Sequence, residues 1–118
     1  MKLSVDLLRS TLLIFLDYRE VYIPVASYQR DLYDPLLALG YSQDEINYDI
    51  EIMLSWPLIR NEFDMNENIL GMSLTYTGQE AAVLASSDFV WADAVKRCSE
   101  TRSAYYFSQI LDEIIQNR

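Results

Sequence analysis

The sequence contains no histidine and only one cysteine among its 118 residues. Without an imidazole group, the chain cannot build a Ser-His-Asp or Cys-His nucleophile system, and it lacks the commonest zinc ligand. Because Cys98 is the one cysteine of the sequence, it cannot form a disulfide within the chain or build a zinc cluster. No side chain has an unperturbed pKa near neutrality. We therefore expect neither an enzyme nor a bound metal or cofactor.

Glycine and proline are scarce as well, with three residues of each, whereas hydrophobic residues make up 51% of the chain. This composition indicates a folded domain and excludes a disordered tail or a fibrous repeat. The longest apolar run, residues 11–16, is bounded by Arg9 and Asp17 and is far too short to cross a bilayer. One domain over residues 1–118, cytoplasmic and without membrane contact, is expected.

Basic residues are also few. Nine Lys and Arg stand against 18 Asp and Glu, so the formal net charge is −9. Residues 31–95 hold twelve acidic residues and one basic residue, a net charge of −11, whereas residues 1–30 and 96–118 each carry +1. Because affinity for the phosphate backbone comes mainly from Lys and Arg, this middle segment is not expected to bind DNA directly.

Hydrophobic periodicity predicts a mainly α-helical chain with a small β-hairpin. Four helices are predicted over residues 5–17, 76–85, 88–98 and 103–116. A short fifth helix is predicted over residues 35–39, with Asp34 as its N-cap, proline at its first position and Gly40 as its stop.

The best-defined helix is predicted from a Ser42 cap. Ser42 and Glu45 have the spacing of a capping box, in which each side chain satisfies a free amide at the start of the helix. Pro57 should end the helix near Ser55. The stripe predicted to face the core consists of Ile46, Ile50, Met53 and Leu54.

Strands are predicted on both sides of this helix. Residues 21–25 alternate on β-rich side chains, and Pro24 fits only an edge or a terminal position of a sheet. After the helix, residues 58–60 and 69–74 form the two strands of a hairpin whose tip covers residues 61–68.

This order of elements is that of a winged helix-turn-helix domain with additional C-terminal helices. The step Leu74-Thr75-x-x-Gly78 after the hairpin supports it, because many winged-helix proteins leave the wing through a similar step. Leu74 would fill the core, Thr75 would cap the next helix, and Gly78 would let that helix pack closely. Residues 1–75 would then form the helix-turn-helix core and the wing, and residues 76–118 the C-terminal helices.

More specifically, the chain resembles a small uncharacterised family that is common in phages and prophages and bears the name of a domain of unknown function. The resemblance implies a winged-helix fold and a mobile-element origin, and it implies no activity. Members tend to carry histidine where Asp49 and Gln79 stand here, so any role of those histidines is absent from this chain. The matching stretches are residues 1–9 (MKLSVDLLR), 40–50 (GYSQDEINYDI) and 74–91 (from LTYTGQE to SDFVW).

The predicted recognition helix carries the wrong charge for DNA. A helix that reads the major groove presents Arg, Lys, Asn or Gln to the base edges, yet residues 42–55 include no basic residue. We therefore predict that this helix and the wing face a basic groove on a protein partner. The predicted partner-binding residues are Asp44, Asn47, Tyr48, Asp49, Glu51, Glu62, Asp64 and Glu67.

This pattern favours a non-enzymatic inhibitor that blocks the nucleic-acid-binding groove of a basic protein such as a CRISPR nuclease, in the manner of DNA-mimic and anti-CRISPR proteins. Two alternatives stay open. The acidic residues are also explained as a solvated face that keeps the domain soluble. A dimeric winged-helix transcriptional regulator would instead bind DNA through Arg9, Arg19, Arg30, Lys96, Arg97 and Arg102. The apolar stripe of residues 103–116 is either core or a homodimer contact.

Overall fold

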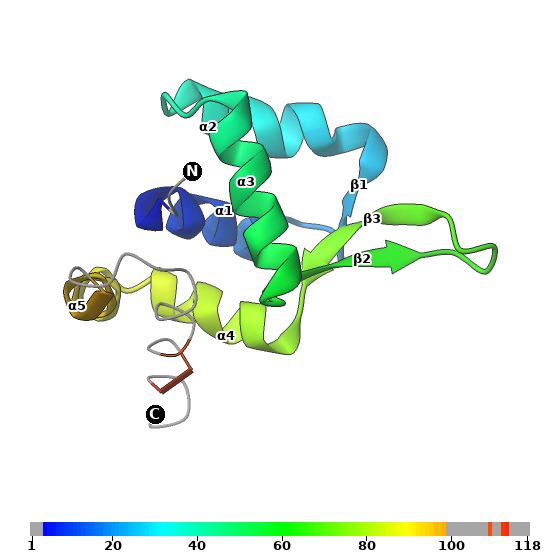
Figure 1. The fold of residues 1–118 in the computed structure, drawn as a ribbon. Helices are drawn as coiled ribbons and strands as arrows, with labels where there is room; N and C mark the ends of the chain where they lie inside the picture. The colour runs from blue at the N-terminus through cyan, green and yellow to red at the C-terminus, as the bar shows by residue number, and fades with distance from the viewer. Residues whose placement is uncertain (1–3, 99–108, 110–111, 114–118) are drawn as a thin grey trace.

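The computed structural model describes residues 4–98, 109 and 112–113. Within these residues, five α-helices accompany a small three-stranded antiparallel sheet (Figure 1), which confirms a mainly α-helical chain with a β-hairpin. In chain order the elements are α1 (Val5–Asp17), β1 (Ile23–Pro24), η1 (Val25–Ser27), η2 (Gln29–Tyr33), α2 (Asp34–Ala38), α3 (Gln43–Ser55), β2 (Ile59–Phe63), β3 (Ile69–Leu74), α4 (Tyr76–Ala85) and α5 (Asp88–Cys98).

Helix α1 is the element around which the others pack. It begins at a Ser4 cap, whose hydroxyl accepts a hydrogen bond from the Leu7 amide (3.2 Å), and it contacts α2, α3, α4 and β3. Leu13 and Ile14 are half-buried, so α1 has one dry face and is not enclosed on all sides. The residues on that dry face are Leu7, Leu8, Thr11, Leu12 and Phe15.

The predicted N-cap at Asp34 is wrong. Residues 29–33 already form a π-helical turn, so the chain enters α2 without the break that a capping residue requires. The Asp34 carboxylate instead accepts a hydrogen bond from the side-chain amide of Gln29 (2.8 Å). The predicted stop at Gly40 is confirmed, since this glycine has a φ of 101° and follows directly on the last turn.

Helix α3 starts and ends where predicted. The Ser42 hydroxyl accepts a hydrogen bond from the Glu45 amide (3.1 Å), and the Glu45 carboxylate accepts one from the Ser42 amide (3.0 Å). The helix ends at Ser55, although Trp56 still has helical backbone angles. Of the predicted core stripe, Ile46, Ile50 and Met53 are buried. The remaining member, Leu54, packs at the edge of the core.

The sheet has the order β1-β3-β2, so β3 is its central strand. Strand β1 is shorter than predicted and pairs Ile23 with Met72 and Pro24 with Gly71. It is an edge strand that ends at its proline, as predicted. A side chain at Gly71 would clash with the carbonyl oxygen of Ile23, so glycine is what lets β1 approach β3. Strand β2 runs further toward the hairpin tip than predicted, to Phe63.

Gly78 has the role predicted for it. A Cβ atom at this position would clash with the carbonyl oxygen of Leu58, so only glycine allows the first turn of α4 to lie against the chain entering β2. Thr75 caps α4, because its hydroxyl oxygen accepts a hydrogen bond from the Gly78 amide (2.9 Å). The hairpin and the C-terminal helices are thus joined through a close backbone contact.

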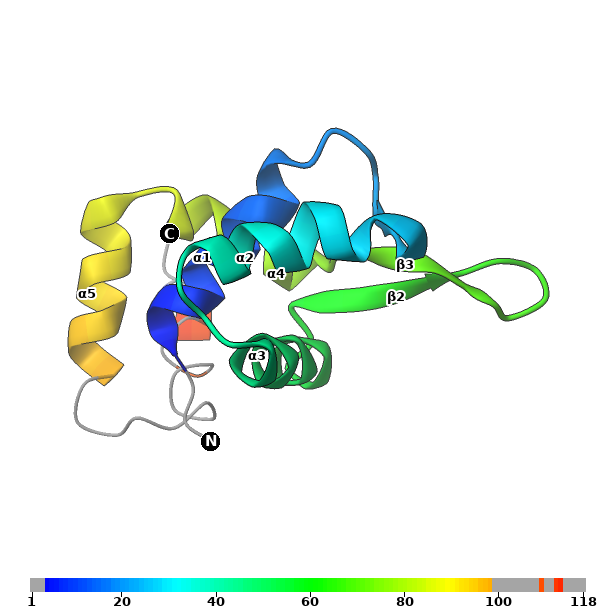
Figure 2. The same cartoon turned by 90° about the horizontal axis from the view of Figure 1, so that it is seen from above.

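Figures 1 and 2 show the hairpin and α5 projecting at opposite ends of the described structure, with α3 crossing between them. None of the described helices is long and apolar enough to span a bilayer. Most of the predicted helix over residues 103–116, and with it the proposed homodimer contact, lies outside the described residues. Those described there are helical: Gln109, Asp112 and Glu113.

Candidate functional site

The solvent side of α3 carries acidic and amide side chains. Asp44, Asn47 and Glu51 are exposed, and Tyr48 is half-buried beside them. The capping box fixes where the helix starts, and the buried stripe fixes its rotation, so these four positions share one side of the helix. Among the described residues, the carboxylates of Asp44 and Glu51 have no hydrogen-bond or ion-pair partner. We call these four residues the α3 face.

Asn47 also holds neighbouring elements together. Its side-chain oxygen accepts hydrogen bonds from the hydroxyl of Tyr33 in η2 (3.1 Å) and from the amide of Gln43 (3.3 Å). The first of these bonds ties the middle of α3 to the segment that precedes α2. A structural role therefore accompanies the predicted role of Asn47 in partner binding.

The hairpin tip is shaped by one of the predicted residues. The Asp64 carboxylate accepts hydrogen bonds from the amides of Asn66 (2.8 Å) and Asn68 (2.9 Å). These bonds, above all that from Asn68, hold the pKa of Asp64 below its usual value. Glu67 is exposed and has a φ of 63°, a left-handed conformation that glycine or asparagine adopts at lower cost. Asp64 thus organises the turn, and Glu67 is presented from it.

Exposed apolar side chains surround these acids on the hairpin. Met65 is fully exposed, and Phe63 is 56% exposed. Ile69 and Leu70 on β3 are also exposed. No basic residue lies between positions 61 and 70. The projecting end of the hairpin therefore combines an apolar surface with negative charge.

In the structure the hairpin tip is the connection between β2 and β3, residues 64–68, so Glu62 lies outside it, on the face of β2 that it shares with Arg60. Its side chain accepts hydrogen bonds from Ser73 (2.6 Å) and Arg60 (3.0 Å) and lines a cavity between the hairpin and the end of α1. The structure therefore distributes the predicted residues other than Asp49 over the α3 face, the hairpin tip and this cavity. The first two belong to elements that meet only where α3 ends and β2 begins, as Figure 1 shows.

Asp49 is not on the exposed face, and the expectation that its carboxylate meets a partner is wrong. The residue is only 2% exposed. One carboxylate oxygen, Oδ2, lies 2.7 Å from the hydroxyl of Thr11 on α1, and the other, Oδ1, has no hydrogen-bond partner among the described residues. Asp49 sits on the inner side of α3, where the helix packs on α1.

The contacts of Thr11 favour a protonated Asp49. The Thr11 hydroxyl lies 2.9 Å from the Leu7 carbonyl oxygen and 2.7 Å from Asp49, but a hydroxyl has one proton to donate. With a neutral Asp49, the acid donates to Thr11 and Thr11 donates to Leu7, so both contacts are hydrogen bonds. With an ionised Asp49, only one of the two contacts of Thr11 is a hydrogen bond. Burial raises the pKa of Asp49 to about 7, although the hydrogen bond with Thr11 opposes that rise.

The sequence held a signal for this burial. Ile46, Asp49, Ile50 and Met53 have the spacing i, i+3, i+4 and i+7, which places all four on one side of a helix. Asp49 therefore belongs by position to the apolar stripe, and only its charge suggested an exposed location. The chain has no histidine, yet the fold creates a group that titrates near neutrality.

The basic residues of the alternative hypothesis are partly engaged within the chain. Arg9 pairs with Asp88 and donates to the carbonyl oxygen of Ala85 (2.8 Å). Arg30 pairs with Asp31 (2.8 Å), and the hydrogen bond from Arg30, followed by that from Tyr18, lowers the pKa of Asp31 to about 2. Arg19 is exposed. Arg102 and the side chain of Arg97 lie outside the described part of the structure.

Among the residues that the structure describes, no three acidic or cysteine side chains are placed together so that they could hold a metal ion. Comparisons with protein-family models, with curated proteins and with solved structures found no match to this chain.

Proposed function

We propose that the chain is a non-enzymatic protein-binding module whose α3 face and hairpin tip occupy the basic nucleic-acid-binding groove of a partner protein. The observation that carries the proposal is the charge of the α3 face, where Asp44 and Glu51 are exposed and unpaired among the described residues and the helix itself contains no Lys or Arg. Such a surface repels phosphates and attracts a surface built to bind them. Phage or prophage origin, implied by the family resemblance, agrees with an inhibitor of this kind.

The proposal takes the fold to be a winged helix. Its support is the order and placement of the elements, since α3 follows the turn after α2 and leads directly into the antiparallel β2–β3 hairpin. In this interpretation α3 is the recognition helix and the hairpin is the wing, with α4 and α5 as additions. The helix that would enter a DNA groove is then the one that carries the acids.

The hairpin tip favours a protein as the partner. Exposed Phe63, Met65 and Ile69 form an apolar surface on a projecting element, and such surfaces commonly mark protein interfaces. A wing that contacts DNA would need Lys or Arg there to neutralise phosphates. We assign long-range attraction to the α3 face and close apolar contact to the hairpin tip.

The test is a binding panel of purified nucleic-acid-binding proteins that includes CRISPR nucleases. The chain should form a salt-sensitive complex with a member of the panel and should displace DNA from it. Glu51→Lys should weaken that complex about tenfold, because it reverses a charge at the interface. Asp17→Lys is the matched control, since it makes the same charge change at an exposed helical position away from α3. Its affinity should stay within about twofold of the unmodified chain.

Three outcomes would contradict the proposal. The first is failure to bind any member of the panel at low salt. The second is a complex that Glu51→Lys and Asp17→Lys weaken equally, which would show that net charge alone matters. The third is a direct mobility shift of DNA by the chain at low salt, which would favour the transcriptional regulator instead.

A further inference from the structure

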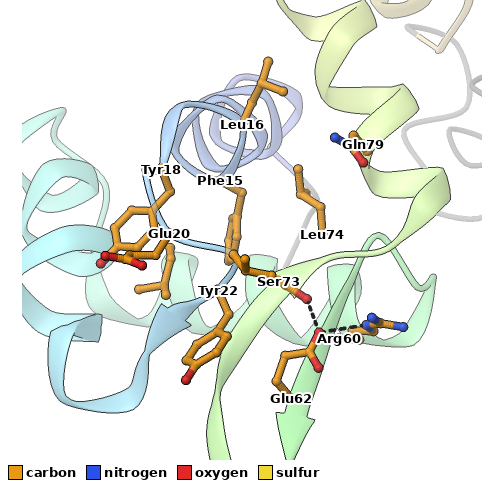
Figure 3. Close-up of a pocket in the computed structure, with 12 residues that line it drawn as sticks. Phe15, Leu16, Tyr18, Glu20, Tyr22, Arg60, Glu62, Ser73, Leu74 and Gln79 are labelled. Atoms are coloured by element: carbon orange, nitrogen blue, oxygen red, sulfur yellow. Dashed lines mark hydrogen bonds and ion pairs between the residues drawn. The ribbon is translucent and has the colours of Figure 1, made fainter.

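A cavity of about 320 Å³ lies between the end of α1, residues 18–22 and one face of the β2–β3 hairpin (Figure 3). Aromatic rings from Phe15, Tyr18 and Tyr22 form part of its wall. Carboxylates are contributed by Glu20 and Glu62. The volume is at the lower end of the range found for small-ligand sites, so the cavity has room for one side chain or a small molecule.

Glu62 is held in place by its neighbours on the sheet. The Ser73 hydroxyl (2.6 Å) and the Arg60 Nε atom (3.0 Å) both donate to the same oxygen of Glu62, Oε1, as the dashed lines in Figure 3 show. The second oxygen, Oε2, has no hydrogen-bond partner among the described residues. The hydrogen bond from Ser73, and then that from Arg60, lowers the pKa of Glu62, which favours the ionised carboxylate.

Other acceptors of the cavity are unused as well. Within the described structure, neither the Glu20 carboxylate nor the Tyr22 hydroxyl has a hydrogen-bond partner. A carboxylate can only accept hydrogen bonds, so the two carboxylates of the lining favour a ligand group that donates them. Its one cation, Arg60, has a side chain that is 64% exposed and already pairs with Glu62. With two carboxylates and one guanidinium, the lining carries a net negative charge.

The aromatic rings suit a cation too. The negative face of a phenol or phenyl ring attracts ammonium and guanidinium groups. Tyr18 is fixed in orientation because its hydroxyl donates to Asp31 (2.7 Å), and the ring of Tyr22 lies over Gly71, where any side chain would clash with it. The rings are therefore held in position before a ligand arrives.

We infer that this cavity binds the guanidinium or primary ammonium group of an alkyl chain. The head group would donate hydrogen bonds to Glu62 Oε2, and its apolar stem would lie against the aromatic wall. Two sources carry this chemistry, namely an arginine or lysine side chain of a bound protein and a free alkyl amine. The inference does not depend on the proposed function, because none of the α3 face residues lines the cavity.

The experiment is a titration of the whole chain followed by NMR chemical shifts and by calorimetry. Two probes separate the sources: N-acetyl-arginine amide represents a protein side chain, and putrescine represents a free amine. The tighter probe identifies the source. Glu62→Gln should weaken binding of that probe about tenfold, because it removes the charge and keeps an oxygen that can accept from Ser73. Glu113→Gln, the same change at an exposed helical residue that does not line the cavity, should leave binding unchanged.

Arg60→Gln should change the affinity for the probe in the opposite direction, and it provides a second test if Glu62→Gln is unstable. Removing the cation that competes for Glu62 should strengthen binding of the same probe severalfold. The inference is overturned if neither probe binds, if Glu62→Gln and Glu113→Gln weaken binding equally, or if Arg60→Gln weakens it. The thermal midpoint of each variant verifies that the fold is retained.

Discussion

The two sides of α3 place the same chemical group in opposite surroundings. On the outer side, Asp44 and Glu51 are exposed to water. On the inner side, Asp49 is 2% exposed and contacts Thr11 of α1. Asp49 and Glu51 are only two positions apart, but successive residues turn by about 100° around a helix, so the two carboxyl groups point in nearly opposite directions.

This difference shows that the acidic residues of the middle segment do not act as one set. The exposed carboxylates are suited to attract a basic partner, as proposed above. The buried group instead contributes to the contact between α1 and α3. Because burial disfavours its charged form, the pKa of Asp49 is raised. Substitutions on the inner and the outer side of α3 should therefore have different effects on the protein.

Asp49→Lys should disrupt the packing of the inner side of α3 on α1. A lysine ammonium at this position would be buried without a carboxylate partner, and we expect a loss of about 3 kcal/mol or more in the free energy of unfolding. Urea denaturation followed by circular dichroism measures the loss. Glu51→Lys is the control on the outer side and should change stability by less than about 0.5 kcal/mol. Equal stability of the two variants would contradict the burial of Asp49.

Asp49→Asn should remove a pH dependence. The folded-state pKa of Asp49, about 7, lies above the ordinary value of 3.8, so the folded chain binds this proton more tightly than the unfolded chain. The resulting stabilisation is complete below about pH 4 and is lost as the pH rises through about 7. Between about pH 5 and about pH 8, the unmodified chain should lose on the order of 2 kcal/mol more than Asp49→Asn.

The measurement is the urea midpoint of both chains across that pH range. The comparison with Asp49→Asn removes the contributions of other groups, such as Asp31, whose pKa is lowered and whose titration lies near pH 2. Parallel pH profiles would show that Asp49 is already ionised in the folded chain at about pH 5, contrary to the hydrogen-bond geometry with Thr11.

Ser42→Ala should weaken α3 without altering either side of it. The variant loses the hydroxyl that accepts from the Glu45 amide, and removal of such a cap costs about 1 kcal/mol. A lower thermal midpoint with an unchanged pH profile is the expected result. A change in the pH dependence would mean that the capping box also controls how deeply Asp49 is buried.

Features with a local cause were predicted from the sequence. The capping box at Ser42 and Glu45 and the stop at Gly40 depend on neighbouring residues and backbone geometry, and both are confirmed. The close packing at Gly78 was also predicted, because the step after the hairpin has a recognisable pattern. The bounds of α1, α3 and α4 also agree with the predicted ones, because hydrophobic periodicity and capping residues are local patterns.

Features that depend on residues far away in the sequence were not predicted. Asp34 has the local pattern of a cap, but the π-helical turn before it removes that role. Strand β1 is shorter than its β-rich sequence suggested, because it has only Gly71 and Met72 of β3 to pair with. The cavity around Glu62 could not be predicted, because its lining comes from segments that are far apart in the sequence. These are α1, the segment before β1, both hairpin strands and α4.

Composition and local patterns are enough to establish the charge of the chain, the absence of histidine and the start and end of most helices. Which carboxyl groups stay in water and which one is buried depends on how the elements pack against one another. The physical reason is desolvation, which depends on what packs around a group. For Asp49, the packing of α3 on α1 makes an ordinary acid titrate near neutrality.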